Sequence, residues 1–302
     1  MRVTVVVNRH GGTVAKGGDT LVARIAEAFR VHGIDADVQP VAPQDLAAAF
    51  ARAADGAPDG IVAAGGDGTI SCAANAAVAA DIPLGIVPLG TLNHFARDAG
   101  LPLDIEGAVA AIADRSERRV DVGELNGRIF VNNSSIGLYP MIVRERDLQR
   151  RWHSAGRSLA MLLASLRALR DFPRKCLRVR IANRQAAIGT PLLMIGNNRY
   201  EPSLTTLGRR SRLDGGTLSV YAVLATSRWR FLQLGLLALI GRLDQQRDFI
   251  ALEGFSAAEI DSLGPRLQVA TDGETMLLET PLRYRIRPGA LRLLGRPSAP
   301  GP

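Results

Sequence analysis

Residues 61–70 read Ile-Val-Ala-Ala-Gly-Gly-Asp-Gly-Thr-Ile, and this stretch decides the fold. An apolar run that ends in Gly65 and Gly66 is typical of a buried strand, and the small residues that follow predict a helix. Glycine lets another group approach the backbone closely, and the first turn of a helix carries free N–H groups at the positive end of its dipole. We therefore expect the N–H groups of residues 66–70 to form a cradle for phosphate.

The cradle differs from two common phosphate-binding loops. No Lys-Ser or Lys-Thr pair closes it as in a P-loop, and its glycines do not follow the dinucleotide-binding spacing. Asp67 alone would repel a polyphosphate, whereas a carboxylate that holds Mg²⁺ would assist its binding. We therefore predict that Asp67 acts through Mg²⁺. The alternative is a tight Gly-Asp-Gly turn that only ends a buried strand.

A second loop repeats this pattern. Residues 82–96 read Ile-Pro-Leu-Gly-Ile-Val-Pro-Leu-Gly-Thr-Leu-Asn-His-Phe-Ala, an apolar strand followed by Gly90 and Thr91 and then by a helix whose start carries Asn93. Successive strand, loop and helix units are typical of a parallel sheet, in which ligands bind at the carboxyl ends of the strands. We expect Thr91 and Asn93 to face the same phosphates as the first loop.

The two loops together resemble a known family. Gly-Gly-Asp-Gly-Thr at 65–69 and Pro-Leu-Gly-Thr-Leu-Asn at 88–93 are similar to the catalytic domain of the diacylglycerol kinase and sphingosine kinase superfamily, in particular its soluble bacterial lipid kinases. The resemblance extends from the first strand to about Arg287. It implies an α/β nucleotide-binding domain with a parallel sheet, as in NAD kinases and diacylglycerol kinases, followed by a second, β-rich antiparallel sandwich-like domain.

The resemblance also implies an activity and its cofactors. It implies a lipid kinase that depends on ATP and Mg²⁺. Diacylglycerol is the first substrate expected, and sphingoid bases or other glycerolipids are the next candidates. NAD kinases share the first loop, but the loop at 90–96 disfavours that activity. A regulatory module that binds lipid or nucleotide without catalysis remains an alternative, because Ser71, Cys72 and Gly215 depart from the family pattern.

Nucleotide contacts are implied at the ends of three predicted strands. The residues that match the family at these positions are Asn8, Gly65, Gly66, Asp67, Gly68, Thr69, Ile70, Ser71, Gly90, Thr91 and Asn93. Arg9 stands where the family usually has Pro, which weakens the assignment of the first of these segments.

Thr-Asp-Gly-Glu at 271–274 places two carboxylates beside a glycine. Paired acids can divide the work of catalysis, one taking a hydroxyl proton while the other orients a group or a metal. The residues alone fit a hairpin turn equally well. The family has Asp-Gly-Glu at the matching place with the Glu as general base. The resemblance therefore implies Glu274 as the base, with Asp272 and Asp67 as further catalytic candidates.

A structural magnesium site is implied in the second domain. Asp-Gly-Gly-Thr-Leu-Ser-Val at 214–220 resembles the family's Asp-Asp-Gly-x-Leu-x-Val, in which an acid binds the metal together with backbone carbonyls. Asp214 falls on the first acid position, and Gly215 occupies the second. The resemblance therefore implies Asp214 as the metal ligand, in a site that is shifted or incomplete.

The repeated pattern of strand, glycine loop and helix stops near residue 120, and strands then predominate. We predict a nucleotide-binding domain at 1–120, a β-rich lipid-substrate domain at 121–286, a C-terminal segment at 287–296 that returns to the first domain, and a disordered tail at 297–302. Strands are predicted at 3–7, 36–41, 128–132, 176–182, 185–189, 192–195, 217–223, 266–271 and 276–279. Helices are predicted at 20–31, 44–54, 103–113, about 144–169 and about 228–240.

The charge of the chain points to an anionic partner. The 302 residues carry a formal net charge of +8, and residues 142–184 hold 12 Arg and Lys against 3 acidic residues. We find no zinc finger, RNP-like strand or helix-turn-helix pattern, so nucleic acid is not expected. An anionic membrane surface fits a lipid kinase better. We expect a cytoplasmic protein that contacts the membrane peripherally.

Two further features concern location and redox state. The uncharged run at 185–198 has 14 residues, fewer than the ~18–20 that a membrane span requires, and the segment at 1–8 is too short for a signal peptide. Cys72 and Cys176 share no metal-ligand or redox spacing. We expect both to be buried, reduced thiols.

Overall fold

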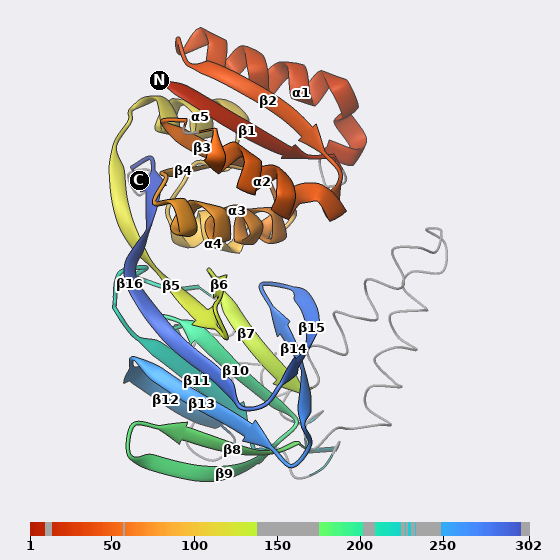
Figure 1. Ribbon diagram of the computed structural model, residues 1–302, viewed down its shortest axis with the longest axis vertical. Coiled ribbons are helices and arrows are strands. Elements are labelled where there is room, and N and C mark those ends of the chain that lie inside the picture. The colour runs from red at the N-terminus through yellow and green to blue at the C-terminus, as the bar shows by residue number, and fades with distance from the viewer. Residues whose placement is uncertain are drawn as a thin grey trace.

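The computed structural model describes residues 1–9, 14–56, 58–137, 175–201, 209–224, 227, 229–230, 233 and 249–296. Within them the chain forms an α/β unit that adjoins a β-rich unit (Figure 1). The helices predicted at 144–169 and 228–240 lie wholly or largely outside the described residues, as do the predicted tail and most of the basic region.

The α/β unit is built on four parallel strands in the order β2-β1-β3-β4. Their apolar residues alternate between two faces, so that Val6, Ile61 and Ala63 join one buried core while Val5 and Val62 join the other. Helices α2 and α3 cover the first face, and α1 and α5 cover the second. The strands are β1 (Arg2–Asn8), β2 (Asp35–Val41), β3 (Gly60–Gly65) and β4 (Leu84–Pro88). The helices are α1 (Val14–Val31), α2 (Leu46–Asp55, after a 3-10 turn at Pro43–Asp45), α3 (Asp67–Ala80), α4 (His94–Asp98) and α5 (Ile105–Ala113).

The β-rich unit contains a second sheet of six strands in the order β12-β11-β10-β7-β14-β15, and every pairing in it is antiparallel. Its apolar face packs against β8, β9, β13 and β16 of the first sheet, with Phe130, Ile195 and Tyr284 in the shared core. The remaining strands are β5 (Glu117–Leu125), β6 (Arg128–Phe130), β7 (Asn133–Gly137), β8 (Lys175–Ile181), β9 (Arg184–Thr190), β10 (Leu192–Asn197), β11 (Leu218–Val223), β12 (Phe249–Phe255), β13 (Ala257–Ser262), β14 (Arg266–Thr271), β15 (Glu274–Glu279) and β16 (Leu282–Leu294). The predicted fold class is confirmed.

The long strand β16 connects the two units (Figure 1). It pairs with β5 along most of its length, and near its end Leu293 pairs in parallel with Leu84 of β4. The register shifts between Arg287 and Leu291, where Gly289 has a φ of 58°. A single ten-stranded sheet therefore runs through both units. The domain boundaries stay predictions.

The expectation that both cysteines are buried is wrong. Cys72 is half-buried on α3, and Cys176 is exposed on β8; both are free. Leu177 and Val179 point into the core, so the alternation of the strand turns Cys176 to the outer face with Arg178. Separately, none of the helices in the described part of the chain has the length and apolar character that crossing a bilayer demands.

Candidate active site

The first two predicted phosphate-binding segments meet at the point where the strand order reverses. From β1 the chain moves to β2 on one side of the sheet, while β3 lies on the other side. In open parallel sheets the crevice beyond the carboxyl ends of two such strands binds ligands. Asn8 ends β1 and Gly65 ends β3, and the Asn8 side-chain amide donates to Thr69 Oγ1 at 3.0 Å. The predicted residues are therefore brought together at a ligand-binding position of the fold.

The glycines of the two loops allow their backbones to touch. A Cβ added at Gly90 would lie 2.6 Å from the Cα of Gly66, and a Cβ at Gly65 would lie 2.4 Å from Thr69 Oγ1. A side chain at Gly90 would push the two loops apart, and one at Gly65 would displace Thr69 at the start of α3. A Cβ at Gly68 would meet nothing within 4 Å, so this position faces open space.

Two of the N–H groups that were expected to bind phosphate already donate hydrogen bonds within the helix. The N–H groups of Thr69 and Ile70 both donate to the Gly66 carbonyl, at 2.9 and 3.1 Å, and the Ile70 side chain is fully buried in the core. Because the helix forms its first bonds here, the prediction that these two N–H groups face a phosphate is corrected. The N–H groups of Gly66, Asp67 and Gly68 are the candidates that remain at this helix end.

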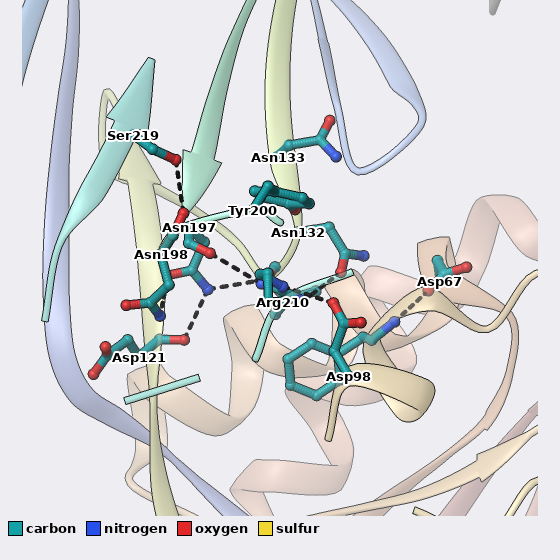
Figure 2. A network of polar contacts seen from close by, with 12 residues as sticks. Asp67, Asp98, Asp121, Asn132, Asn133, Asn197, Asn198, Tyr200, Arg210 and Ser219 are labelled. Atoms are coloured by element: carbon teal, nitrogen blue, oxygen red, sulfur yellow. Dashed lines mark hydrogen bonds and ion pairs between the residues drawn. The ribbon is translucent and has the colours of Figure 1, made fainter. Parts of the chain in front are cut away.

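Asp67 links the starts of two helices. Its Oδ1 accepts from the Phe95 N–H of α4 at 3.1 Å (Figure 2). In the described part of the chain this is the one hydrogen bond seen at the carboxylate, which is half-buried. Mg²⁺ at nucleotide sites is held by one or two carboxylates together with substrate phosphates. The residues here fit such an ion, with Asp67 as the carboxylate.

Asn93 shapes the second loop. It has a φ of 50°, its Oδ1 accepts from the Gly90 N–H at 2.9 Å, and its Nδ2 donates to the Gly90 carbonyl at 3.0 Å. Its amide is therefore used to fold the loop. The neighbouring Thr91 is exposed and offers the loop's available hydroxyl.

Glu274, the predicted base, forms an ion pair with an arginine that was not predicted from the sequence. Arg128 of β6 donates to its Oε2 at 2.6 Å, and both side chains are 46% exposed. Burial and, next, the Glu274 carboxylate raise the pKa of the Cys72 thiol to about 11. Arg128 precedes Ile129, which is hydrogen-bonded to Asn75 of α3, so Glu274 lies near the helix that begins at the glycine loop.

Asp272 is occupied by the backbone. It is buried at a φ of 48°, and its carboxylate accepts from three N–H groups: Val131 at 2.8 Å, Asn132 at 2.8 Å and Asn133 at 3.2 Å. Burial raises the pKa of this carboxyl above its ordinary value, against the effect of these donors and of the Ser71 hydroxyl. We assign Asp272 to holding the hairpin that carries Glu274, and not to proton transfer.

Asn75 joins α3 to the β-rich unit. Its Nδ2 donates to the Ile129 carbonyl at 3.0 Å, and its Oδ1 accepts from the Ile129 N–H at 2.9 Å. The amide thus pairs with β6 as a neighbouring strand would. Ile129 follows Arg128, so this clamp holds the partner of Glu274 beside α3. Asn75 was not predicted, since its one signal in the sequence is a lone amide among the alanines of the helix.

Asp214, the implied ligand of a structural magnesium ion, is an exposed carboxylate paired with an arginine. Arg212 donates to Asp214 at 3.0 Å, which holds the pKa of that carboxyl below its usual range, and the Asp214 side chain is 63% exposed. A cavity of about 210 Å³ here is lined by Asp98, Arg118, Arg119, Val120, Ser211, Arg212, Leu213 and Asp214. Among the described residues no group of three His, Cys, Asp or Glu side chains could hold a metal ion.

Comparison with known proteins covers both units. Residues 2–125 match the family model of the diacylglycerol kinase catalytic domain, and residues 141–295 match that of the YegS C-terminal NAD kinase beta sandwich-like domain. A Pseudomonas aeruginosa protein named "Probable lipid kinase YegS-like" is 31% identical over 270 residues, which cover 88% of this chain and 83% of that protein.

Two further relatives extend the comparison. A Staphylococcus haemolyticus protein named "Diacylglycerol kinase" is 46% identical over 83 residues, which cover 26% of this chain and 24% of that protein. A solved structure described as a diacylglycerol kinase from Bacillus anthracis superposes with a TM-score of 0.66 over 98% of this chain and 97% of that one. At 22% identity this second likeness concerns the fold.

Proposed function

Because this chain belongs to the diacylglycerol kinase family of lipid kinases, in its YegS-like branch, we propose that it transfers the γ-phosphoryl group of ATP to a lipid hydroxyl. Diacylglycerol is the proposed substrate, and phosphatidic acid the product. The Staphylococcus relative bears the name of that activity, which supports the choice over sphingoid bases and other glycerolipids.

One observation carries the proposal. The glycine loops at the ends of β3 and β4 touch each other, and α3, which starts in the first loop, is clamped by Asn75 to the strand that holds Arg128 against Glu274. A phosphate-binding position and a half-exposed carboxylate therefore adjoin one helix. Phosphoryl transfer requires mainly alignment and charge neutralisation, which such an arrangement supplies.

The reaction divides the roles between the two units. Glu274 takes the proton as the lipid oxygen forms its bond to the γ-phosphorus and the bond from that phosphorus to the ADP oxygen breaks. The N–H groups of Gly66, Asp67 and Gly68, with the Thr91 hydroxyl, orient the phosphates. Magnesium bound with ATP neutralises phosphate charge, and Asp67 would hold it. Arg128 holds the free Glu274 in place, and must yield or share it when the hydroxyl arrives.

A turnover screen tests the proposal. Purified protein is supplied with ATP and Mg²⁺ and with diacylglycerol, sphingosine, other glycerolipids or NAD⁺, each in mixed micelles or buffer, and phosphorylated product is measured. Phosphatidic acid formed faster than any other product is the expected result. Transfer to NAD⁺ would contradict the assignment. ATP binding without transfer to any acceptor would favour a regulatory module, in line with the departures at Ser71, Cys72 and Gly215.

A further inference from the structure

Asp98 and Arg210 form a buried ion pair between the two units. Asp98 ends α4, and Arg210 lies before β11 in the β-rich unit. Arg210 Nε donates to Asp98 Oδ2 at 2.7 Å, and the two side chains are 0% and 2% exposed. The arginines in the other ion pairs of the described residues are all at least 28% exposed. Buried charge is costly unless its geometry is well satisfied, so this pair requires an explanation.

Each nitrogen of the Arg210 guanidinium has at least one hydrogen-bond acceptor (Figure 2). Its remaining donors reach Val131 O at 2.6 Å, Asn132 Oδ1 at 2.8 Å and Asn197 O at 3.2 Å. The rings of Phe95 and Tyr200 lie 5.9 and 5.5 Å from its Cζ, within the range of a cation–π contact. Arg210 is therefore fixed by the fork geometry of its donors and by two aromatic rings, a combination that lysine lacks.

Backbone N–H groups beside each end of this network donate hydrogen bonds to residues of the candidate active site. Asp98 belongs to the short helix α4, whose Phe95 N–H donates to Asp67 beside the glycine loop. On the other side, the N–H groups of Val131 and Asn132 donate to Asp272, two residues before Glu274. The ion pair thus joins the loop expected to bind phosphate to the hairpin that carries the candidate base.

On the basis of the proposed kinase function, we propose that Asp98 and Arg210 are positioning residues that set the hairpin of Glu274 relative to the glycine loops. Both side chains are buried and cannot touch a substrate. A misplacement of about 1 Å from a mutation far from the chemistry can cost about 10²-fold in rate. Removal of the pair therefore lowers kcat, while ATP binding, which uses the loops alone, is retained.

Apolar replacement separates positioning from stability. A buried pair exchanged for apolar residues of similar volume is often as stable as the original. The double variant Asp98→Leu, Arg210→Met is therefore expected to fold, with a Tm lowered only by the donors that Val131 O, Asn132 Oδ1 and Asn197 O lose, and with an ATP Kd within about twofold of that of the wild type. Its kcat should fall by about 10²-fold. Arg210→Lys keeps the positive charge and loses the several donors of the planar guanidinium, so its kcat should fall by a smaller factor. This variant replaces the double variant in the test if the double variant does not fold.

The matched control carries the same substitutions at an exposed pair. Arg24→Met with Glu106→Leu removes the 2.7 Å ion pair between α1 and α5 and should leave every measured quantity unchanged. A wild-type kcat in the folded double variant and in Arg210→Lys would overturn the positioning role. So would a loss of kcat matched by an equal loss of ATP affinity.

Hydrogen exchange gives a readout that needs no turnover. The amides of Val131 and Asn132, which donate to Asp272, should exchange faster in the double variant and at the wild-type rate in the control. Unchanged exchange at these amides would overturn the proposal. A wild type without lipid turnover would instead reject the proposed function, and the exchange result would still decide whether the pair orders the hairpin of Glu274.

Discussion

Gly68 and Cys72 lie four residues apart at the start of α3 and face different surroundings. Gly68 is in the first turn, where an added Cβ would meet open space. Cys72 is half-buried near the ion pair of Arg128 with Glu274. One position reports on the nucleotide side of the candidate site, and the other reports on its catalytic side.

Gly68→Val is expected to weaken ATP binding by ~10-fold or more, because its branched side chain would enter the phosphate space. The fold should tolerate it, since the position is free of contacts and its φ lies outside the left-handed region. Calorimetry of ATP binding on the folded variant measures the effect. Gly264→Val, in the turn between β13 and β14, is the control. An unchanged ATP affinity would show that the first loop is only a turn.

Cys72 should resist alkylation. Its pKa of about 11 leaves roughly one thiol in a thousand ionised at pH 8, and only the thiolate reacts. Cys176 is exposed and should be modified by iodoacetamide first. As the pH rises from 8 towards 10 the rate at Cys72 should grow about tenfold per unit. Mass spectrometry of the two peptides measures both rates, and equal rates at pH 8 would contradict this account of the site.

The sequence indicates some of these residues far better than others. The glycine loops follow from general rules, because an apolar strand that ends in glycines before a helix has few other interpretations. Glu274 needed the family resemblance, since Asp-Gly-Glu also describes a hairpin turn. Arg210 lies in the run Arg-Arg-Ser-Arg, in which nothing marks the one guanidinium that the fold buries. Such partners come from residues distant in sequence and depend on tertiary contacts.

Among the elements, α3 and β6 do most to assemble the candidate site. The helix presents its first turn to the ligand-binding crevice, and two turns later it pairs through Asn75 with Ile129. Strand β6 is only three residues long and also pairs with β5. Its position relative to the helix therefore depends heavily on a single amide side chain.

Asn75→Ala is expected to leave both the N–H and the carbonyl of Ile129 without their partner. Groups unpaired in this way cost about 1–3 kcal/mol of stability. We also expect kcat for lipid phosphorylation to fall while ATP affinity stays the same, because β6 carries Arg128 and not the phosphate loops. Urea denaturation and steady-state kinetics measure the two effects. Asn75→Gln, which keeps the amide and displaces it by one methylene, should lower kcat with a smaller loss of stability.

Two results would contradict a role of the contact between Asn75 and Ile129 in positioning β6 for catalysis. If Asn75→Ala loses stability and its kcat at saturating substrates equals that of the wild type, then the clamp is structural only. If ATP affinity falls together with kcat, the amide acts on the helix start instead of on β6.

The predicted elements of the α/β unit agree with the structure, whereas β5, β12, β13 and β16 were not predicted. Residues 282–287 of β16 alternate as Leu-Arg-Tyr-Arg-Ile-Arg, which is a strand pattern, but Pro288 and Gly289 interrupt it. The structure accommodates the interruption by a register shift against β5. Strand β12 lies at a sheet edge, and its Leu252 is 41% exposed. Its sequence therefore lacks the clear alternation of apolar and polar residues that a half-buried strand shows.

At the scale of the whole molecule, the chain combines a continuous sheet with an uneven charge. The ten-stranded sheet ties the nucleotide-binding unit to the β-rich unit, and β16 runs through both (Figure 1). The surplus of Arg and Lys is concentrated at residues 142–184, most of which lie outside the described residues. We propose that this region draws the protein to anionic bilayers, where each basic side chain near the surface is worth ~1 kcal/mol.

Arg144, Arg146, Arg150 and Arg151 changed to Gln should lower binding to anionic vesicles, and binding by the wild type should weaken as salt rises from 0.1 to 1 M, because the Debye length falls from ~10 to ~3 Å. Vesicle sedimentation measures both effects. Four exposed arginines of the α/β unit changed to Gln (Arg24, Arg30, Arg52 and Arg115) form the control. Binding indifferent to salt and to the first set would reject an electrostatic dock.

We propose Glu274 as the base that acts across from the glycine loops. Glu274→Gln keeps the shape and removes the base, so single-turnover transfer at saturating ATP and diacylglycerol should fall by ~10²–10⁴-fold with ATP affinity unchanged. Glu279→Gln is the matched control, because it lies on the same strand and also pairs with an arginine, Arg266, at 3.2 Å. A Glu274→Gln variant that retains more than about a tenth of the wild-type rate would contradict the claim and place the base elsewhere.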